Sequence, residues 1–124
     1  MTADDPCPCG TGRVYGSCCG PLHGQARTAD GVEELMRSRY SAYAVGDTDH
    51  LFRTWHPRTR PADLTPDPAL TWTGLRVIAV EQSADSGTVE FRATYAGPAG
   101  PGELHERSLF ARRGGRWVYV EAES

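Results

Sequence analysis

The chain has 124 residues, of which 39% are hydrophobic and 23% are charged, and this balance excludes a chain that is disordered throughout. No apolar run approaches the ~18–20 residues of a membrane-spanning helix, and residues 1–6 lack the basic and apolar stretches of a signal peptide, so we expect a cytoplasmic protein with no membrane association. All 13 basic residues are arginine and the net charge is −3, which gives no strong nucleic-acid signature.

The first 24 residues contain all four cysteines and few apolar side chains, so hydrophobic burial alone cannot order them. Cys7 and Cys9 flank one proline, and eight residues separate Cys9 from the adjacent Cys18 and Cys19. Four thiolates this close in sequence suit a tetrahedral zinc ion. We therefore predict that a Zn2+ ion is bound by Cys7, Cys9, Cys18 and Cys19.

The cysteines could also serve as disulfides, as a redox pair or as inert thiols. Disulfides are uncommon in cytosolic proteins, and a bond between the adjacent Cys18 and Cys19 would be strained. Cys7 and Cys9 could form a redox-active pair, whereas inert thiols would need an apolar core that this segment does not offer. As a variant of the zinc site, His23 could replace Cys18 or Cys19, because zinc accepts a histidine nitrogen as well as a thiolate.

Two helices are expected next. The apolar residues that indicate the first helix follow helical spacing: Val32, Leu35, Met36, Tyr40 and Tyr43. Asp30 is the candidate N-cap of this helix, and Gly46 is the candidate stop. A second, shorter helix fits residues 48–55, after which Pro57 forces His56 out of helical geometry.

From residue 70 onward the apolar pattern alternates with period two, which is typical of β-strands. Four strands are expected, at residues 75–80, 89–95, 104–111 and 117–120. The first has apolar residues on both faces, so we expect both to be covered. Three arginines flank the last turn: Arg112, Arg113 and Arg116. We expect a solvated hairpin there rather than a phosphate site. Helices followed by strands predict an α+β fold, with the helices on one face of an antiparallel meander.

Two resemblances to known families follow from these residues. The segment from Cys7 to Gly20, CPCGTGRVYGSCCG, resembles the SEC-C motif, which binds zinc in the SecA translocase and contacts the SecB chaperone and the ribosome. The rest of the chain resembles the YchJ family of small bacterial proteins through the segments LMRSRY, TWHP, WTGL, ERS and GRW. The resemblance implies a zinc knuckle over residues 1–24 and a nuclear-transport-factor-two-like cone of two to three helices on a curved antiparallel sheet over residues 25–124. It implies no established activity.

A curved sheet that wraps over helices leaves a cavity at its open end, and such cavities often hold ligands. The residues that we expect near it are Arg39, Tyr40, Trp55, His56, Trp72, Glu106 and Ser108. Glu106 alternates with apolar neighbours, so we expect it to be largely buried. A buried carboxylate needs a partner, which Arg39, Tyr40 or His56 would supply. A His56–Glu106 pair would suit acid–base chemistry, but an ion pair that fixes helix against sheet is the preferred interpretation.

Three functions are compatible with these features. The favoured one is a zinc-stabilised binding module, in which Arg13, Val14 and Tyr15 between the ligand pairs contact a partner protein or the ribosome. The alternative is a small-molecule binder or an enzyme that uses the pocket of the cone. The third is a thiol redox or zinc-storage protein. The sequence identifies neither the partner nor the ligand.

Overall fold

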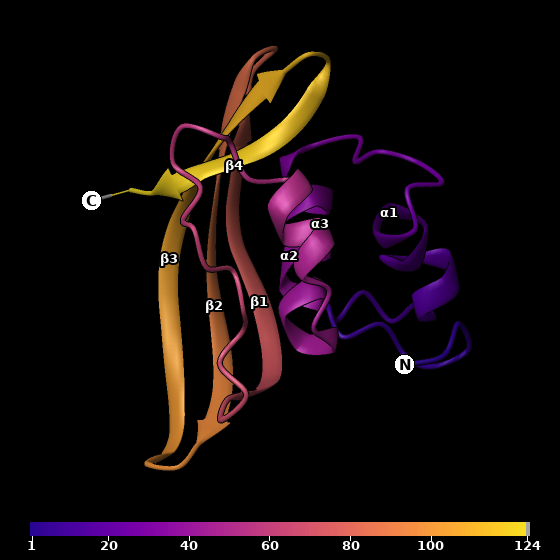
Figure 1. Cartoon of the computed structure of the whole chain (residues 1–124), viewed down its shortest axis with the longest axis vertical. Coiled ribbons are helices and arrows are strands. Elements are labelled where there is room, and N and C mark those ends of the chain that lie inside the picture. Colours follow the sequence, from indigo (N-terminus) through magenta and orange to yellow (C-terminus); the bar gives the residue numbers. More distant parts are fainter. Residues whose placement is uncertain (124) are drawn as a thin grey trace.

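Three layers make up the molecule, which a computed structural model describes over residues 1–123 (Figure 1). The first layer is a four-stranded antiparallel sheet. Two helices, α2 (Val32–Val45) and α3 (Thr48–Arg53), cover one face of the sheet. The N-terminal segment, with η1 (Tyr15–Ser17) and α1 (Gly20–His23), lies on the far side of these helices. This arrangement confirms the predicted α+β class.

The strands follow one another across the sheet in sequence order, each antiparallel to the next: β1 (Thr71–Gln82), β2 (Ser86–Gly97), β3 (Gly100–Arg113) and β4 (Arg116–Ala122). They form the predicted meander and curve around α2 (Figure 1). The strands are longer than the alternation indicated, because pairing continues to the turns. Gly97 lies opposite Gly100, and Arg113 lies opposite Arg116.

One face of the sheet supplies the core and the other carries charges. Val89, Phe91 and Phe110 are buried in a cluster with Leu35 and Met36 of α2. This burial supplies most of the stabilisation of the cone, because each fully buried large apolar side chain contributes about 1.5–3 kcal/mol. Ion pairs connect the strands elsewhere: Arg92–Glu103 and His105–Glu90 join β2 and β3, and Arg107–Glu81 joins β3 and β1 across β2. Such pairs contribute little to stability and indicate a solvated surface.

The prediction that β1 is covered on both faces is wrong. Ile78 and Val80 are 44% and 41% exposed. Two features explain the difference: the helices cover only one face of the sheet, and a bulge between Val77 and Ala79 disturbs the alternation along β1.

The start of α2 differs from the prediction and its end agrees with it. Gly31, not Asp30, is the N-cap residue, and the Val32 N–H donates to the side-chain oxygen of Gln82 at 2.9 Å. The helix is therefore capped by the end of β1, a contact distant in sequence. Gly46 ends α2 in the left-handed conformation with φ 80°, which glycine adopts without steric cost.

Helix α3 ends at Arg53, two residues earlier than expected, because the chain then pairs with β4. The Tyr119 N–H donates to the Thr54 carbonyl at 2.7 Å, and the His56 N–H donates to the Tyr119 carbonyl at 2.8 Å. At the start of α3, the Asp47 side chain accepts a hydrogen bond from the His50 N–H at 3.0 Å. This pairing places Trp55 beside the open end of the sheet.

Candidate metal centre and ligand cavity

The four cysteines form one buried group, which we call the cysteine cluster (Cys7, Cys9, Cys18 and Cys19). Their Sγ atoms all lie within 4.8 Å of one another, and those of Cys9 and Cys18 are 3.5 Å apart. A tetrahedral zinc site with Zn–S bonds of about 2.3 Å has S···S edges of about 3.8 Å. All four residues are free cysteines. The donor set and spacing of the cluster therefore fit one tetrahedral metal ion.

A tight loop brings the two cysteine pairs together. Pro6 and Val14 form an antiparallel bridge, and the Cys7 N–H donates to the Arg13 carbonyl at 2.9 Å. Gly10 and Gly12 turn the chain with φ 83° and 85°, in the left-handed region that side chains other than glycine rarely adopt. The loop is therefore a small hairpin with the sulfur atoms gathered on one side.

Helix α2 holds the cysteine cluster in place. The Ser41 hydroxyl donates to the Cys19 Sγ at 3.2 Å and lies 3.6 Å from the Cys7 Sγ. The Arg37 guanidinium donates to the Cys9 carbonyl at 2.7 Å. The cysteines belong to the same apolar core as Val32. The sequence-based expectation that this segment has no core is wrong, because α2 supplies one.

The pKa values of three thiols in the cysteine cluster differ in direction, with one lowered and two raised. A hydrogen bond from Cys19 lowers the pKa of Cys9, and the same contact raises the pKa of Cys19. Burial raises the pKa of Cys18. The ionised form is thus favoured at Cys9, and a divalent cation would let Cys18 and Cys19 lose their protons as well.

His23 is not part of the cysteine cluster. Its Nδ1 lies 2.5 Å from the Tyr15 hydroxyl, and its Nε2 lies 2.8 Å from the Ser38 carbonyl. Because the carbonyl only accepts, Nε2 carries the proton and Nδ1 accepts from Tyr15. Both ring nitrogens are therefore occupied, and Tyr15 turns inward. Of the three residues expected to contact a partner, Arg13 and Val14 are exposed and Tyr15 is half-buried.

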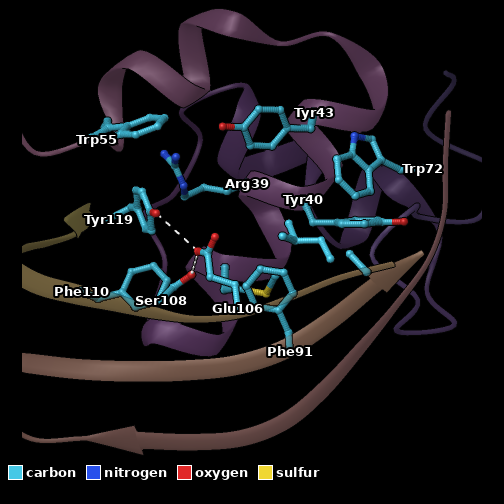
Figure 2. A pocket seen from close by; sticks show the side chains of 13 residues that line it. Arg39, Tyr40, Tyr43, Trp55, Trp72, Phe91, Glu106, Ser108, Phe110 and Tyr119 are labelled. Carbon is cyan, nitrogen blue, oxygen red and sulfur yellow. Dashed lines mark hydrogen bonds between the residues drawn. The ribbon is translucent and has the colours of Figure 1, made fainter. Parts of the chain in front are cut away.

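The second candidate site is a cavity of about 340 Å³ between α2 and the sheet, which we call the cone cavity. Of the seven residues predicted near such a cavity, six line it: Arg39, Tyr40, Trp55, Trp72, Glu106 and Ser108 (Figure 2). His56 lies outside it, since its Nδ1 accepts from the Arg58 N–H and its backbone pairs with β4. The His56–Glu106 pair considered from the sequence does not form.

Sequence reasoning missed two polar residues of the cone cavity, Tyr43 and Tyr119. Tyr43 follows Arg39 by four residues on α2, so helical spacing was a usable signal. Tyr119 and Trp117 alternate with Val118 and Val120 on β4, but only the assembled sheet places Tyr119 in the cavity, because it pairs with Phe110 of β3, which lines the same cavity.

Arg39 carries the positive charge of the cone cavity. Its Cζ lies 4.8 Å from the centroid of the Trp55 ring and 4.6 Å from that of Tyr119, distances typical of cation–π contacts. Its Nη1 donates to the Thr54 hydroxyl at 2.7 Å and the Leu51 carbonyl at 3.2 Å. Burial lowers the pKa of Arg39 to about 10, so the side chain stays charged at neutral pH.

Glu106 carries the negative charge. Its Oε2 accepts from the Ser108 hydroxyl at 2.5 Å and from the Tyr119 hydroxyl at 3.3 Å (Figure 2). The expected hydrogen bond to Arg39, Tyr40 or His56 is absent among residues 1–123, and Glu106 is half-buried rather than largely buried. The reason is Tyr119, whose ring contacts Arg39 while its hydroxyl contacts Glu106. Burial and the nearby Glu106 charge raise the pKa of Tyr119, which remains a neutral donor.

A buried cysteine cluster held on an α+β cone with an internal cavity defines the class: a SEC-C knuckle joined to an NTF2-like domain. A model of the YchJ middle NTF2-like domain matches residues 31–122, and a SEC-C motif matches residues 5–21. The chain therefore belongs to the YchJ family, as its sequence indicated. None of the helices in the described part of the chain is long and apolar enough to cross a membrane.

Relatives and solved structures agree with this assignment. A UPF0225 protein of Streptomyces coelicolor is 50% identical over 95% of this chain and 94% of its own length. A UPF0225 protein of Deinococcus radiodurans is 49% identical over 94% of this chain and 88% of its own length. The solution structure of a SEC-C motif protein of Rhodopseudomonas palustris has a TM-score of 0.85 at 37% identity, covering 95% of this chain and 97% of that one. The crystal structure of a SEC-C motif protein of Psychrobacter arcticus has a TM-score of 0.81 at 27% identity, covering 96% of this chain and 82% of that one.

Proposed function

We propose that this protein binds a small molecule in the cone cavity, and that a zinc ion in the cysteine cluster holds its N-terminal segment on α2. The observation that carries the first part is the composition of the cone cavity. Aromatic and aliphatic side chains form most of its wall, and Arg39 and Glu106 supply opposite charges at defined positions. A mainly apolar cavity with a few oriented polar groups is the usual form of a small-molecule site.

Zinc is proposed in a structural role. Four protein thiolates complete its coordination and leave no position for a substrate, as in structural zinc sites. When bound, zinc would supply the positive charge that four ionised sulfurs require. The burial of all four sulfurs also counts against a thiol redox role, because reactive cysteines are partly exposed.

Binding is favoured over catalysis at the cone cavity. Oε2 of Glu106 is already held by Ser108 and Tyr119, and Arg39 is held between two rings and two hydrogen-bond acceptors. His56, the base considered from the sequence, lies elsewhere. These groups are therefore suited to orient a ligand: Arg39 offers N–H donors, and Glu106 offers an acceptor for a ligand N–H or O–H.

A neutral fluorescent probe tests this proposal. N-phenyl-1-naphthylamine has two aromatic groups for the wall and one N–H for Glu106. We expect one probe per chain and a loss of about tenfold or more in affinity for Leu104→Trp, which fills the mouth of the cavity. Ile78→Trp is the matched control, because Leu104 and Ile78 are 38% and 44% exposed and Ile78 lies outside the cavity. Equal binding by both variants, or none by the parent, would refute the proposal.

Partner binding by the knuckle is the second candidate function, and the exposure of Val14, at 42%, favours it. Val14 and Arg13 lie on the loop between the two cysteine pairs, where an apolar and a cationic side chain face solvent together. Affinity capture from a native lysate with the parent, the double variant Arg13→Glu/Val14→Asp and the control Ile78→Asp tests this candidate. A protein or ribosome partner is expected to be lost only with the double variant. A partner retained by the parent and by both variants would exclude this surface.

A further inference from the structure

A second cavity, of about 420 Å³, gathers arginine side chains from distant parts of the chain. We call it the arginine pocket, after the residues Arg27, Arg53, Arg60, Arg113 and Arg116 that line it. They come from the segment after α1, from α3, from the loop after α3 and from the β3–β4 hairpin. Within residues 1–123, no aspartate or glutamate lines this pocket. The chain as a whole has a net charge of −3, so this concentration of positive charge is local.

Three of these arginines have no acidic partner among residues 1–123. Arg27 pairs with Glu34, and Arg53 pairs with Asp49 at 2.8 Å. No ion pair within the described chain involves the remaining three, which are Arg60, Arg113 and Arg116. Like charges gathered at one cavity repel one another, and a bound anion would relieve this repulsion.

Arg60 is already positioned for binding. Its Cζ lies 3.6 Å above the centroid of the Phe52 ring, and its Nη1 donates to the Phe52 carbonyl at 3.3 Å. A guanidinium fixed by stacking and one hydrogen bond keeps its other N–H groups for an oxyanion and loses less entropy on binding. Arg113 and Arg116 are opposite each other across the last residue pair of the hairpin.

The arginine pocket also has an apolar part, next to the polar lining residues Gln25, Thr28, His50 and Thr54. Its lining includes the buried side chains of Leu35, Trp117 and Val118. Apolar walls exclude water and strengthen a charge–charge contact at their edge. The pocket therefore combines sites for a strongly charged oxyanion with a surface for an organic body.

We propose that the arginine pocket binds a small phosphorylated molecule, with Arg60, Arg113 and Arg116 on the phosphate. A phosphomonoester carries about 1.5–2 negative charges at neutral pH and three acceptor oxygens, which matches three unpaired guanidinium groups better than a single carboxylate does. Arginine forks also bind phosphate oxygens in a bidentate manner. This site is separate from the cone cavity, and its occupation does not depend on the function proposed above.

Calorimetric titration of the intact, zinc-loaded chain tests the proposal with phenyl phosphate, benzoate and inorganic phosphate. We expect phenyl phosphate to bind at one per chain, about tenfold or more tightly than benzoate because of its higher charge, and more tightly than inorganic phosphate because of its ring. Arg60→Gln and Arg113→Gln should each weaken phenyl phosphate about tenfold or more, since each removes a charged hydrogen bond. Arg58→Gln and Arg76→Gln are the matched controls, because both residues are exposed and lie outside the pocket lining.

Four results would overturn the proposal. The first is equal weakening by the Arg113 and Arg76 variants, and the second is no binding of phenyl phosphate by the folded parent. The third is loss of phenyl phosphate binding in Leu104→Trp, which would place the ligand in the cone cavity. The fourth is tighter binding of a short single-stranded RNA than of phenyl phosphate, which would make this surface an RNA site. Near-ultraviolet circular dichroism checks that each variant is folded.

Discussion

His50 is the most deeply buried histidine of the chain, and its Nε2 lies 2.9 Å from the Ser38 hydroxyl. Burial lowers the pKa of His50 to about 3, whereas an unfolded histidine has a pKa of about 6.5. The unfolded chain therefore binds a proton between these values that the folded chain excludes. It follows that the free energy of unfolding is fully present above about pH 6.5 and decreases as the pH falls toward 3.

This prediction is checked by urea unfolding between pH 7.5 and 5. The contribution of His50 is isolated by comparing the parent with His50→Leu, because zinc release affects both proteins alike. We expect the stability of the variant to change less with pH than that of the parent. His105→Leu is the control, since His105 is exposed and pairs with Glu90. If the free energy of unfolding changed equally with pH in the parent and in His50→Leu, the lowered pKa of His50 would be contradicted.

Glu106 carries a second prediction at the scale of a residue. Glu106→Ala removes two hydrogen bonds to a carboxylate and leaves the Ser108 and Tyr119 hydroxyls without their acceptor. We expect a loss of about 1–3 kcal/mol in the free energy of unfolding, less than the ~3–5 kcal/mol lost when a buried ion pair is broken. Glu106→Gln keeps an acceptor oxygen and should lose less. The stability of both variants is measured by thermal melts. A Glu106→Ala variant that melts like the parent would refute the hydrogen bonds of Glu106 to Ser108 and Tyr119.

At the scale of the element, sequence reasoning located α2, α3 and all four strands, because apolar spacing on helices and strands is a local property, but it did not predict the short α1. It failed where a distant segment decides the outcome. Gln82 of β1 caps α2, and pairing with Tyr119 ends α3 early. The cysteine loop was predicted from its spacing, but its attachment to Ser41 and Arg37 depends on the packing of two segments.

Removal of zinc is expected to unfold the N-terminal segment and leave the cone folded. Two of the hydrogen bonds that hold the segment, from Ser41 and Arg37, lie at the cysteine cluster, whereas the core of the cone is formed by the sheet and α2 and includes Phe91, Phe110 and Trp117. Metal binding therefore supplies most of the folding free energy of the segment. Hydrogen exchange after chelation should rise in residues 1–24 and stay low in β2 and β3. Loss of the near-ultraviolet tryptophan signal would show instead that the two parts unfold together.

At the scale of the whole molecule, the sequence predicted the cone cavity but not the arginine pocket. Alternation in β3 and helical spacing in α2 indicate which residues face each other across one helix and one sheet. The arginine pocket joins four segments, and no local pattern relates Arg60 to Arg113 or Arg27. Trp55 lines both cavities, so the two proposed sites share one wall.

The three tryptophans allow one measurement to test both sites. Trp72 lines only the cone cavity, Trp117 lines only the arginine pocket, and Trp55 lines both. Nitrogen-15 NMR resolves the indole N–H signal of each. We predict that N-phenyl-1-naphthylamine shifts the signals of Trp72 and Trp55 and leaves that of Trp117 in place, whereas phenyl phosphate shifts Trp117 and Trp55 but not Trp72. If the neutral probe left Trp72 unmoved, the central claim of a ligand site inside the cone would be contradicted.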